Sequence, residues 1–294
     1  MERIRLTIGL TVLCLCCTTG CLFRSHRVEA KRSLAPLKSA TQTELVAKIN
    51  EAAATVITMN ATVDIDTTVG GEKKGKVIEY QQIRGYILAQ KPKMLRMIGL
   101  LPIVRNRAFD MVSDGDNFEL SIPPKNRFIK GSAQITTPSS NSLENLRPQV
   151  IYEALLIPAI DEKNEIAVIE EGLQQVEDTK EHKMVSQPNY HLLVLRRGAH
   201  DSWHLYRKIY FNRADLQPYR QSIYDDHGAM VTDAVYSSSK DYEGVRYPSL
   251  IEIERPQEEY NITIKMLKLT MNAPLKPEQF QLEVPPGATI TELK

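Results

Sequence analysis

The chain has 294 residues, with 37 Lys and Arg against 36 Asp and Glu, and therefore a formal net charge of +1. This balance excludes the overall basic field by which many proteins hold nucleic acid. All four cysteines lie within residues 14–21, so the rest of the chain has no disulfide framework, no thiolate nucleophile and no cysteine-ligated zinc.

The first 20 residues have the pattern of a signal peptide. Arg3 and Arg5 precede an apolar stretch at residues 6–17, which is too short to cross a hydrocarbon core about 30 Å thick. Gly20 and Cys21 follow, and this pair resembles the end of a bacterial lipoprotein signal. The resemblance implies cleavage before Cys21 and anchoring to membrane lipid through acyl chains, such as palmitate, on that cysteine. An ordinary secretory signal with incidental cysteines is the alternative.

Residues 21–40 connect this signal to the rest of the chain. They contain several basic side chains and few large apolar ones, which is typical of a tether. Leu22 occupies the position where, in the proteobacterial sorting rule, an Asp retains lipoproteins in the inner membrane. Its identity favours the outer membrane, with the protein facing the periplasm.

The body of the chain begins with a helix and continues as strands. Thr41 and Glu44 fit a capping box and predict a helix over about 42–54. Apolar residues then alternate with polar ones from Ile57 to Ile65, which predicts a half-buried strand. Further strands are expected at 77–89, 94–98, 107–112, 118–122, 174–180, 190–197, 202–212, 219–225, 230–238, 247–255 and 259–270.

A second helix is expected at residues 148–157, between Pro148 and Pro158. The proline-rich segment 272–294 is expected to be irregular. About eleven strands in hairpin order, with no strand–helix–strand alternation, predict a mainly β fold. We therefore expect one domain over 41–294, an antiparallel, strongly curved sheet or unclosed β-barrel whose helices plug the concave face.

Motifs for catalysis or metal binding are scarce. His200 and His204 are four residues apart in an expected strand, which places them about 13 Å apart, too far to share one metal ion. The chain has no Gly-x-Ser-x-Gly elbow and no phosphate-binding glycine loop. We expect no enzyme activity, no cofactor, no metal site and no nucleic-acid partner.

A strongly curved sheet needs its own side chains, a helix or a ligand on its concave face. We expect the inward strand residues to line an apolar lipid cavity, with Ile151 and Leu155 on the second helix as a lid. An ordinary filled core is the alternative. The strand candidates are Ile57, Met59, Val63, Ile65, Trp203, Leu205, Ile209, Phe211, Ile262, Ile264 and Met266.

The later half of the chain carries a family resemblance. A strand ending in the run 211–218 leads to a hairpin at Gly228, and Pro285-Pro286-Gly287 lies near the end of the chain. These features resemble the LolA/LolB group of outer-membrane lipoprotein-sorting proteins, and the N-terminal anchor is similar to that of LolB. The resemblance implies an acyl-chain or lipoprotein cargo, a periplasmic carrier as partner, and lipoprotein sorting or lipid transfer. A structural or sensory envelope lipoprotein with a filled core, and no lipid cargo, is the alternative.

The segment Gly99-Leu100-Leu101-Pro102 falls between two expected strands. Two adjacent leucines are costly to expose without a use, and LolB has a similar protruding apolar loop. Leu100 and Leu101 are therefore candidates for contact with membrane or cargo. The alternative is that both leucines turn inward and cap the end of the barrel.

Overall fold

The computed structural model describes residues 36–73, 75–133, 147–178 and 182–293. The predicted signal peptide, most of the tether and Cys21 lie outside these residues. The helices are α2 (Gln42–Thr55) and α3 (Pro148–Leu155). The strands are β1 (Thr58–Gly71), β2 (Lys76–Gln90), β3 (Met94–Leu100), β4 (Arg107–Ser113), β5 (Asn117–Ile122), β6 (Arg127–Ser132), β7 (Glu165–Asp178), β8 (Lys183–Arg197), β9 (Trp203–Asn212), β10 (Pro218–Tyr224), β11 (Met230–Tyr242), β12 (Val245–Arg255), β13 (Tyr260–Met271) and β14 (Thr289–Leu293).

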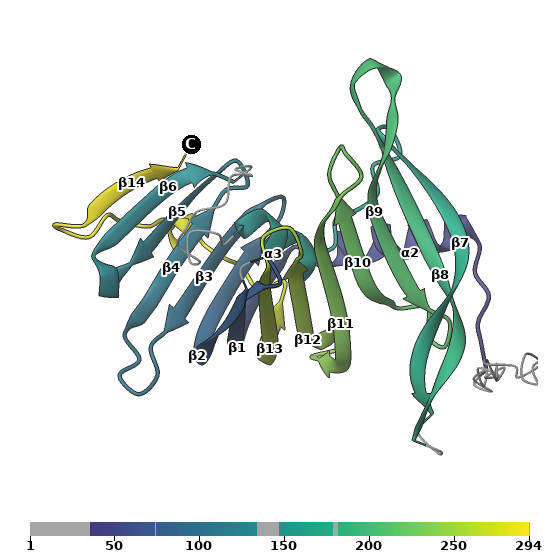
Figure 1. Cartoon of the computed structure of the whole chain (residues 1–294), viewed down its shortest axis with the longest axis horizontal. Helices are drawn as coiled ribbons and strands as arrows, with labels where there is room; N and C mark the ends of the chain where they lie inside the picture. Colours follow the sequence, from purple (N-terminus) through teal and green to yellow (C-terminus); the bar gives the residue numbers. More distant parts are fainter. Residues whose placement is uncertain (1–35, 74, 134–146, 179–181, 294) are drawn as a thin grey trace, which may run out of the picture. The chain divides into compact units, whose positions relative to one another are not determined.

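All these strands belong to a single sheet with two ends (Figure 1). Its order is β14-β6-β5-β4-β3-β2-β1-β13-β12-β11-β10-β9-β8-β7. Neighbours are hairpin-connected and antiparallel in most cases, whereas β14 pairs with β6 in parallel. The prediction of a mainly β fold with an unclosed antiparallel sheet is confirmed. The described residues contain more strands than the sequence pattern indicated.

The chain divides into two compact units. The larger holds residues 35–174 and 188–294, and the smaller includes residues 175–187, the far end of the β7–β8 hairpin. Within the smaller unit, Gln175 Nε2 donates to Ser186 Oγ at 2.9 Å. Both helices and every site described below belong to the larger unit.

Helix α2 begins at the predicted capping box. The backbone N–H of Glu44 donates to Thr41 Oγ1 at 3.3 Å, and Thr41 N–H donates to the Glu44 carboxylate at 2.7 Å. These two bonds satisfy N–H groups that a helix start otherwise leaves free. The buried face of α2 then packs on β7–β9, in a core cluster that includes Leu45, Ile49, Leu192, Ile209 and Phe211.

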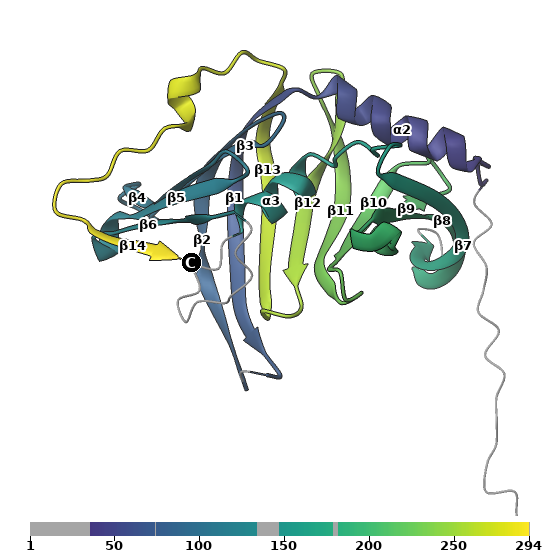
Figure 2. The same cartoon turned by 90° about the horizontal axis from the view of Figure 1, so that it is seen from above.

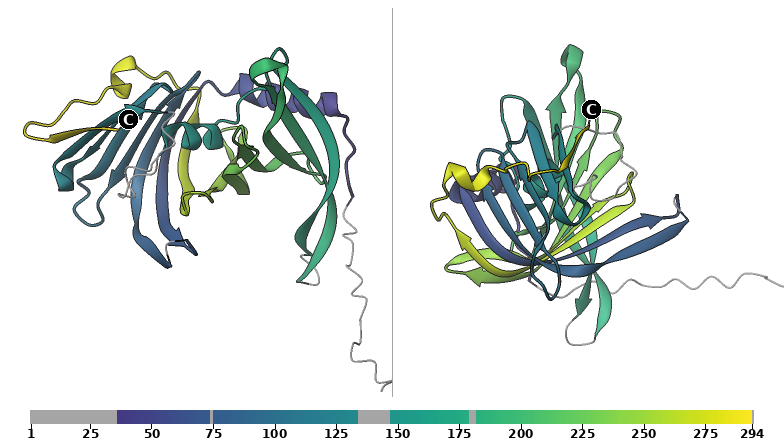
Figure 3. Two further views of the ribbon diagram at one scale, coloured as in Figure 1. Left: turned by 45° about the horizontal axis from the view of Figure 1, so that its top comes forward. Right: turned by 90° about the vertical axis from the view of Figure 1, so that its left-hand side faces the viewer.

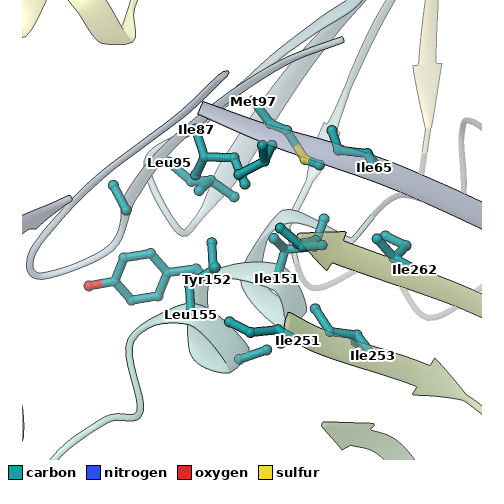
Figure 4. Packing of buried hydrophobic residues seen from close by; sticks show 14 of the residues in the cluster. Ile65, Ile87, Leu95, Met97, Ile151, Tyr152, Leu155, Ile251, Ile253 and Ile262 are labelled. Carbon is teal, nitrogen blue, oxygen red and sulfur yellow. The ribbon is translucent and has the colours of Figure 1, made fainter. Parts of the chain in front are cut away.

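Helix α3 packs into the larger core of the same sheet. Ile151, Tyr152 and Leu155 lie among apolar side chains from β1–β3 and β12–β13 (Figure 4). A row of paired residues crosses the sheet from one helix to the other. It begins at Ile209 beneath α2 and ends at Ile262 near α3, by way of Gln221, Ala234 and Ile253. The two helices therefore cover the same face, as Figure 2 also shows.

A bulge in β9 overturns one predicted face. Arg207 lies opposite Val194, but Leu205 lies opposite Leu195, so Tyr206 is an extra residue. An extra residue reverses the alternation beyond it. Trp203 is accordingly 42% exposed and Leu205 half-buried, whereas Ile209 and Phe211 are fully buried. The expectation that all four share one inward face was wrong.

Ile57 also departs from the expected inward face. It lies in the connection before β1 and is 50% exposed. Its backbone N–H donates to Asn272 Oδ1 at 2.7 Å, and Asn272 Nδ2 donates to Thr55 O at 2.8 Å. These bonds hold the end of α2 against the end of β13 and leave the Ile57 side chain in solvent.

The C-terminal segment is more regular than its prolines suggested. It forms a 3₁₀ turn at Pro277–Phe280, where Phe280 is buried and Arg96 Nη1 donates to Gln279 O at 2.9 Å. It then crosses to β6, where β14 pairs from Thr289 to Leu293 (Figure 3). Strands β1 and β6 are thus both paired with strands from the end of the chain.

Candidate functional site

A cavity of about 380 Å³ lies between the two helices and the sheet. Apolar side chains of both helices and of the residues that follow them form much of its wall, and the β2–β3 turn and strands β10–β12 also contribute. The lining residues are Lys48, Ile49, Glu51, Ala52, Ala53, Thr55, Val56, Lys91, Ala154, Leu155, Leu156, Ile157, Gln217, Pro218, Tyr236, Ser239, Val245, Arg246, Tyr247 and Pro248. This volume lies at the lower end of the range of small-molecule sites.

Two tyrosines belong to the wall, of which Tyr236 is buried and Tyr247 is half-buried. Tyr247 donates its hydroxyl to the carbonyl of Leu155 at 2.6 Å and so satisfies one of the free carbonyls at the end of α3. Tyr236 is 8% exposed, and its hydroxyl has no hydrogen-bond partner among the described residues. Burial raises the pKa of both hydroxyls, which therefore stay protonated at neutral pH.

Lysine 91 lies in the turn between β2 and β3, at the wall of the cavity near the end of α2. Its backbone N–H donates to Ile57 O at 2.9 Å. The side chain is half-buried, and desolvation by burial lowers the pKa of its ammonium group. Lys48 and Arg246 add positive charge to the same wall, and Glu51 is the one carboxylate among the lining residues.

A buried arginine fixes the segment that follows α3. Arg207 is 1% exposed; its Nη1 donates to Pro158 O at 2.8 Å and its Nη2 donates to Ala159 O at 3.0 Å. Glu165 faces the same guanidinium at 3.5 Å. Burial lowers the pKa of Arg207, opposed by the nearby Glu165 carboxylate. Arg207 thereby ties the α3–β7 connection to β9.

Two neighbours complete this polar cluster. Arg196 lies over the Tyr206 ring with Cζ 3.2 Å from the ring centroid, and it donates to Glu165 at 2.7 Å. Tyr206 OH lies 3.5 Å from the Glu153 carboxylate on α3. The β9 bulge places Tyr206 beside Arg207. The alternating pattern gave no signal of this bulge, because it depends on pairing with β8.

The predicted cavity residues separate into three groups. Leu155 lines the cavity. Met59, Val63, Ile65, Ile151, Ile262, Ile264 and Met266 are buried in the core around α3, and Ile209 and Phe211 in the core beneath α2. Ile57, Trp203 and Leu205 are exposed or half-buried as described above. That the buried residues line a lipid cavity stays a prediction.

The loop after β3 exposes apolar side chains three residues later in the chain than predicted. Leu100 is the last residue of β3, and Leu100 and Leu101 are both half-buried. Leu101 N–H donates to Asn106 O at 2.7 Å, which leaves residues 102–105 as the tip. Ile103 is 98% exposed with φ 69°, and Val104 is 63% exposed. A β-branched residue is strained in this left-handed conformation.

No protein-family model matches the chain, and neither does the sequence of any curated protein. Solved structures do match its fold. A LolA superfamily protein from Nitrosomonas europaea is 12% identical, with a TM-score of 0.50, covering 83% of this chain and 99% of its own. A DUF1329 family protein from Desulfovibrio piger is 14% identical, with a TM-score of 0.50, covering 81% and 94%.

These similarities concern the fold, because the sequence identities are low. A putative outer membrane lipoprotein-sorting protein domain from Vibrio parahaemolyticus is also similar, with 13% identity, a TM-score of 0.47, and coverage of 80% and 94%. None of the helices in the described part of the chain is both long and apolar enough to span a membrane. In fold, the chain is similar to the LolA superfamily protein and to the DUF1329 family protein.

Proposed function

We propose that this protein is an envelope lipoprotein that binds an acyl chain in the cavity between α2 and α3. The observation that carries the proposal is the cavity itself, whose wall includes Ala52, Val56, Leu155 and Ile157. Burial of each CH₂ group of a bound chain contributes about 0.8 kcal/mol. The LolA-like fold supports a lipid or lipoprotein as ligand and a carrier or receptor role rather than catalysis.

The proposal includes the position of the protein in the envelope. Lipidation of Cys21 would anchor it, with Leu22 favouring the outer membrane and the body facing the periplasm. The apolar tip at Ile103 and Val104, rather than Leu100 and Leu101, is the part suited to contact membrane or cargo. A periplasmic carrier would be the donor, and directional transfer requires that this protein bind cargo more tightly than the donor does.

Two tryptophan substitutions in α2 test the binding site. Ala52 and Ala54 are both exposed on α2, but only Ala52 lines the cavity. Ala52→Trp should fill the cavity and abolish binding of lauric acid in isothermal titration calorimetry. Ala54→Trp, the matched control, should bind like the unmodified protein. Equal binding by both variants would place the ligand elsewhere.

A second function is favoured by the core around α3. Ile151, Tyr152 and Leu155 are at most 4% exposed and fill the space between the strands. This packing is what a structural or sensory envelope lipoprotein with a filled core would have. Native mass spectrometry of the purified protein separates the two functions, because co-purified lipid is expected only for the binding protein.

A further inference from the structure

We propose that the ligand of the cavity is a single-chain amphiphile with an anionic head group, and that Lys91 binds this head group. The inference rests on the proposed acyl-chain function and adds the chemistry of the ligand's polar end.

The wall of the cavity carries more positive than negative side chains. Lys48 on α2, Lys91 in the β2–β3 turn and Arg246 on β12 bring three cations from separate elements, against the single carboxylate of Glu51. Arg246 has a partner, Asp215, at 3.5 Å. An anion entering the cavity therefore meets an excess of positive charge, which attracts it and fixes its orientation.

Lys91 is a partly buried cation without a partner among the described residues. Its side chain is half-buried, and its ammonium has no ion-pair or hydrogen-bond partner among the residues that the structure describes. A partly desolvated charge without a partner is unfavourable. A carboxylate or phosphate placed against the Lys91 ammonium would form a charge-assisted hydrogen bond and compensate for the hydration that this ammonium loses on burial. The apolar wall formed by Ala154, Leu155 and Ile157 can then accommodate the alkyl chain.

The size of the cavity limits how many alkyl chains it can hold. The cavity of about 380 Å³ lies near the bottom of the range for small-molecule sites, which favours one chain over two. The head group can be the carboxylate of a fatty acid or the phosphate of a single-chain phospholipid. Both supply the same anionic oxygens, and the ligands of the test distinguish them.

The test compares three ligands of equal chain length by isothermal titration calorimetry at neutral pH: 1-dodecanol, laurate and dodecyl phosphate. The two anions are used below their micellar concentrations and the alcohol below its solubility limit. At least one of the two anions should bind about ten-fold or more tightly than the alcohol, because it adds a charge-assisted bond. The better anion identifies the head group. Added salt should reduce this difference.

Two variants assign the effect to its residue. Lys91→Met should remove the preference for the anion over dodecanol. Lys93→Met is the matched control, because Lys93 lies in the same turn, belongs to no part of the wall and pairs with Asp116 at 3.4 Å. A preference that persists in Lys91→Met would overturn the assignment.

The outcomes separate this inference from the proposed function. Equal affinity for all three ligands would overturn the anionic head group and leave acyl-chain binding intact. Failure of all three to bind the unmodified, correctly folded protein would refute both. Circular dichroism of each variant shows whether a loss of binding reflects a loss of folding.

Discussion

Replacing Arg207 by methionine should destabilise the protein by about 2–4 kcal/mol. Arg207 is 1% exposed and donates to the carbonyls of Pro158 and Ala159, while Glu165 lies 3.5 Å away. Removal of one partner of a buried ion pair costs about 3–5 kcal/mol. We expect less here, because Arg196 still pairs with Glu165 at 2.7 Å and because Pro158 and Ala159, whose carbonyls would lose a donor, are not buried residues.

Urea unfolding followed by circular dichroism measures this loss. The control is Arg196→Met, since the Arg196 side chain is 41% exposed and should contribute only about 1 kcal/mol or less. Hydrogen exchange adds a local measurement, because amides near residues 156–160 should exchange faster when Arg207 is absent. A free energy of unfolding for Arg207→Met within about 1 kcal/mol of the unmodified protein would refute the reasoning.

The remaining predictions concern binding and anchoring. Leu155→Ala should lower the free energy of unfolding by about 2–5 kcal/mol if α3 only fills the core, whereas a change mainly in laurate affinity would support a ligand cavity. Ile103→Asn should stabilise the protein by about 1 kcal/mol, since asparagine tolerates the left-handed conformation, yet reduce association with liposomes; unchanged association would remove the tip from the membrane contact. Cys21→Ser should leave the protein unlipidated, and normal detergent partitioning of that variant would contradict anchoring at this residue.

Local patterns were sufficient for much of the fold. The capping box at Thr41 and Glu44 marked the start of α2 correctly, because its hydrogen bonds join residues three apart. The alternation from Met59 to Ile65 identified the buried face of β1, because successive side chains of a strand point to opposite faces. Where the structure depends on a distant partner, the pattern failed. The β9 bulge arises from pairing with β8, and it turns Trp203 toward solvent.

The candidate site was less accessible to sequence analysis than the fold. Its wall combines residues from α2, the β2–β3 turn, α3 and strands β10–β12, and none of these segments carries a recognisable ligand-binding motif. Leu155 was found because it lies on the buried face of a recognisable helix. Lys91 and Tyr236 were missed, because a lysine after a strand and a tyrosine within one are common, and only tertiary packing buries them.

The pairing of the sheet also sets the order in which the chain can fold. Strands β2–β6 follow β1 as local hairpins, but the free edges of β1 and β6 are covered by β13 and β14, near the end of the chain. The bond from Ile57 to Asn272 spans 215 residues, and closing a loop of that length costs about 5 kcal/mol of chain entropy. The N-terminal half of the sheet therefore keeps two unpaired strand edges until β13 and β14 have been synthesised and have paired with it. A chain truncated before β13 should aggregate through those edges.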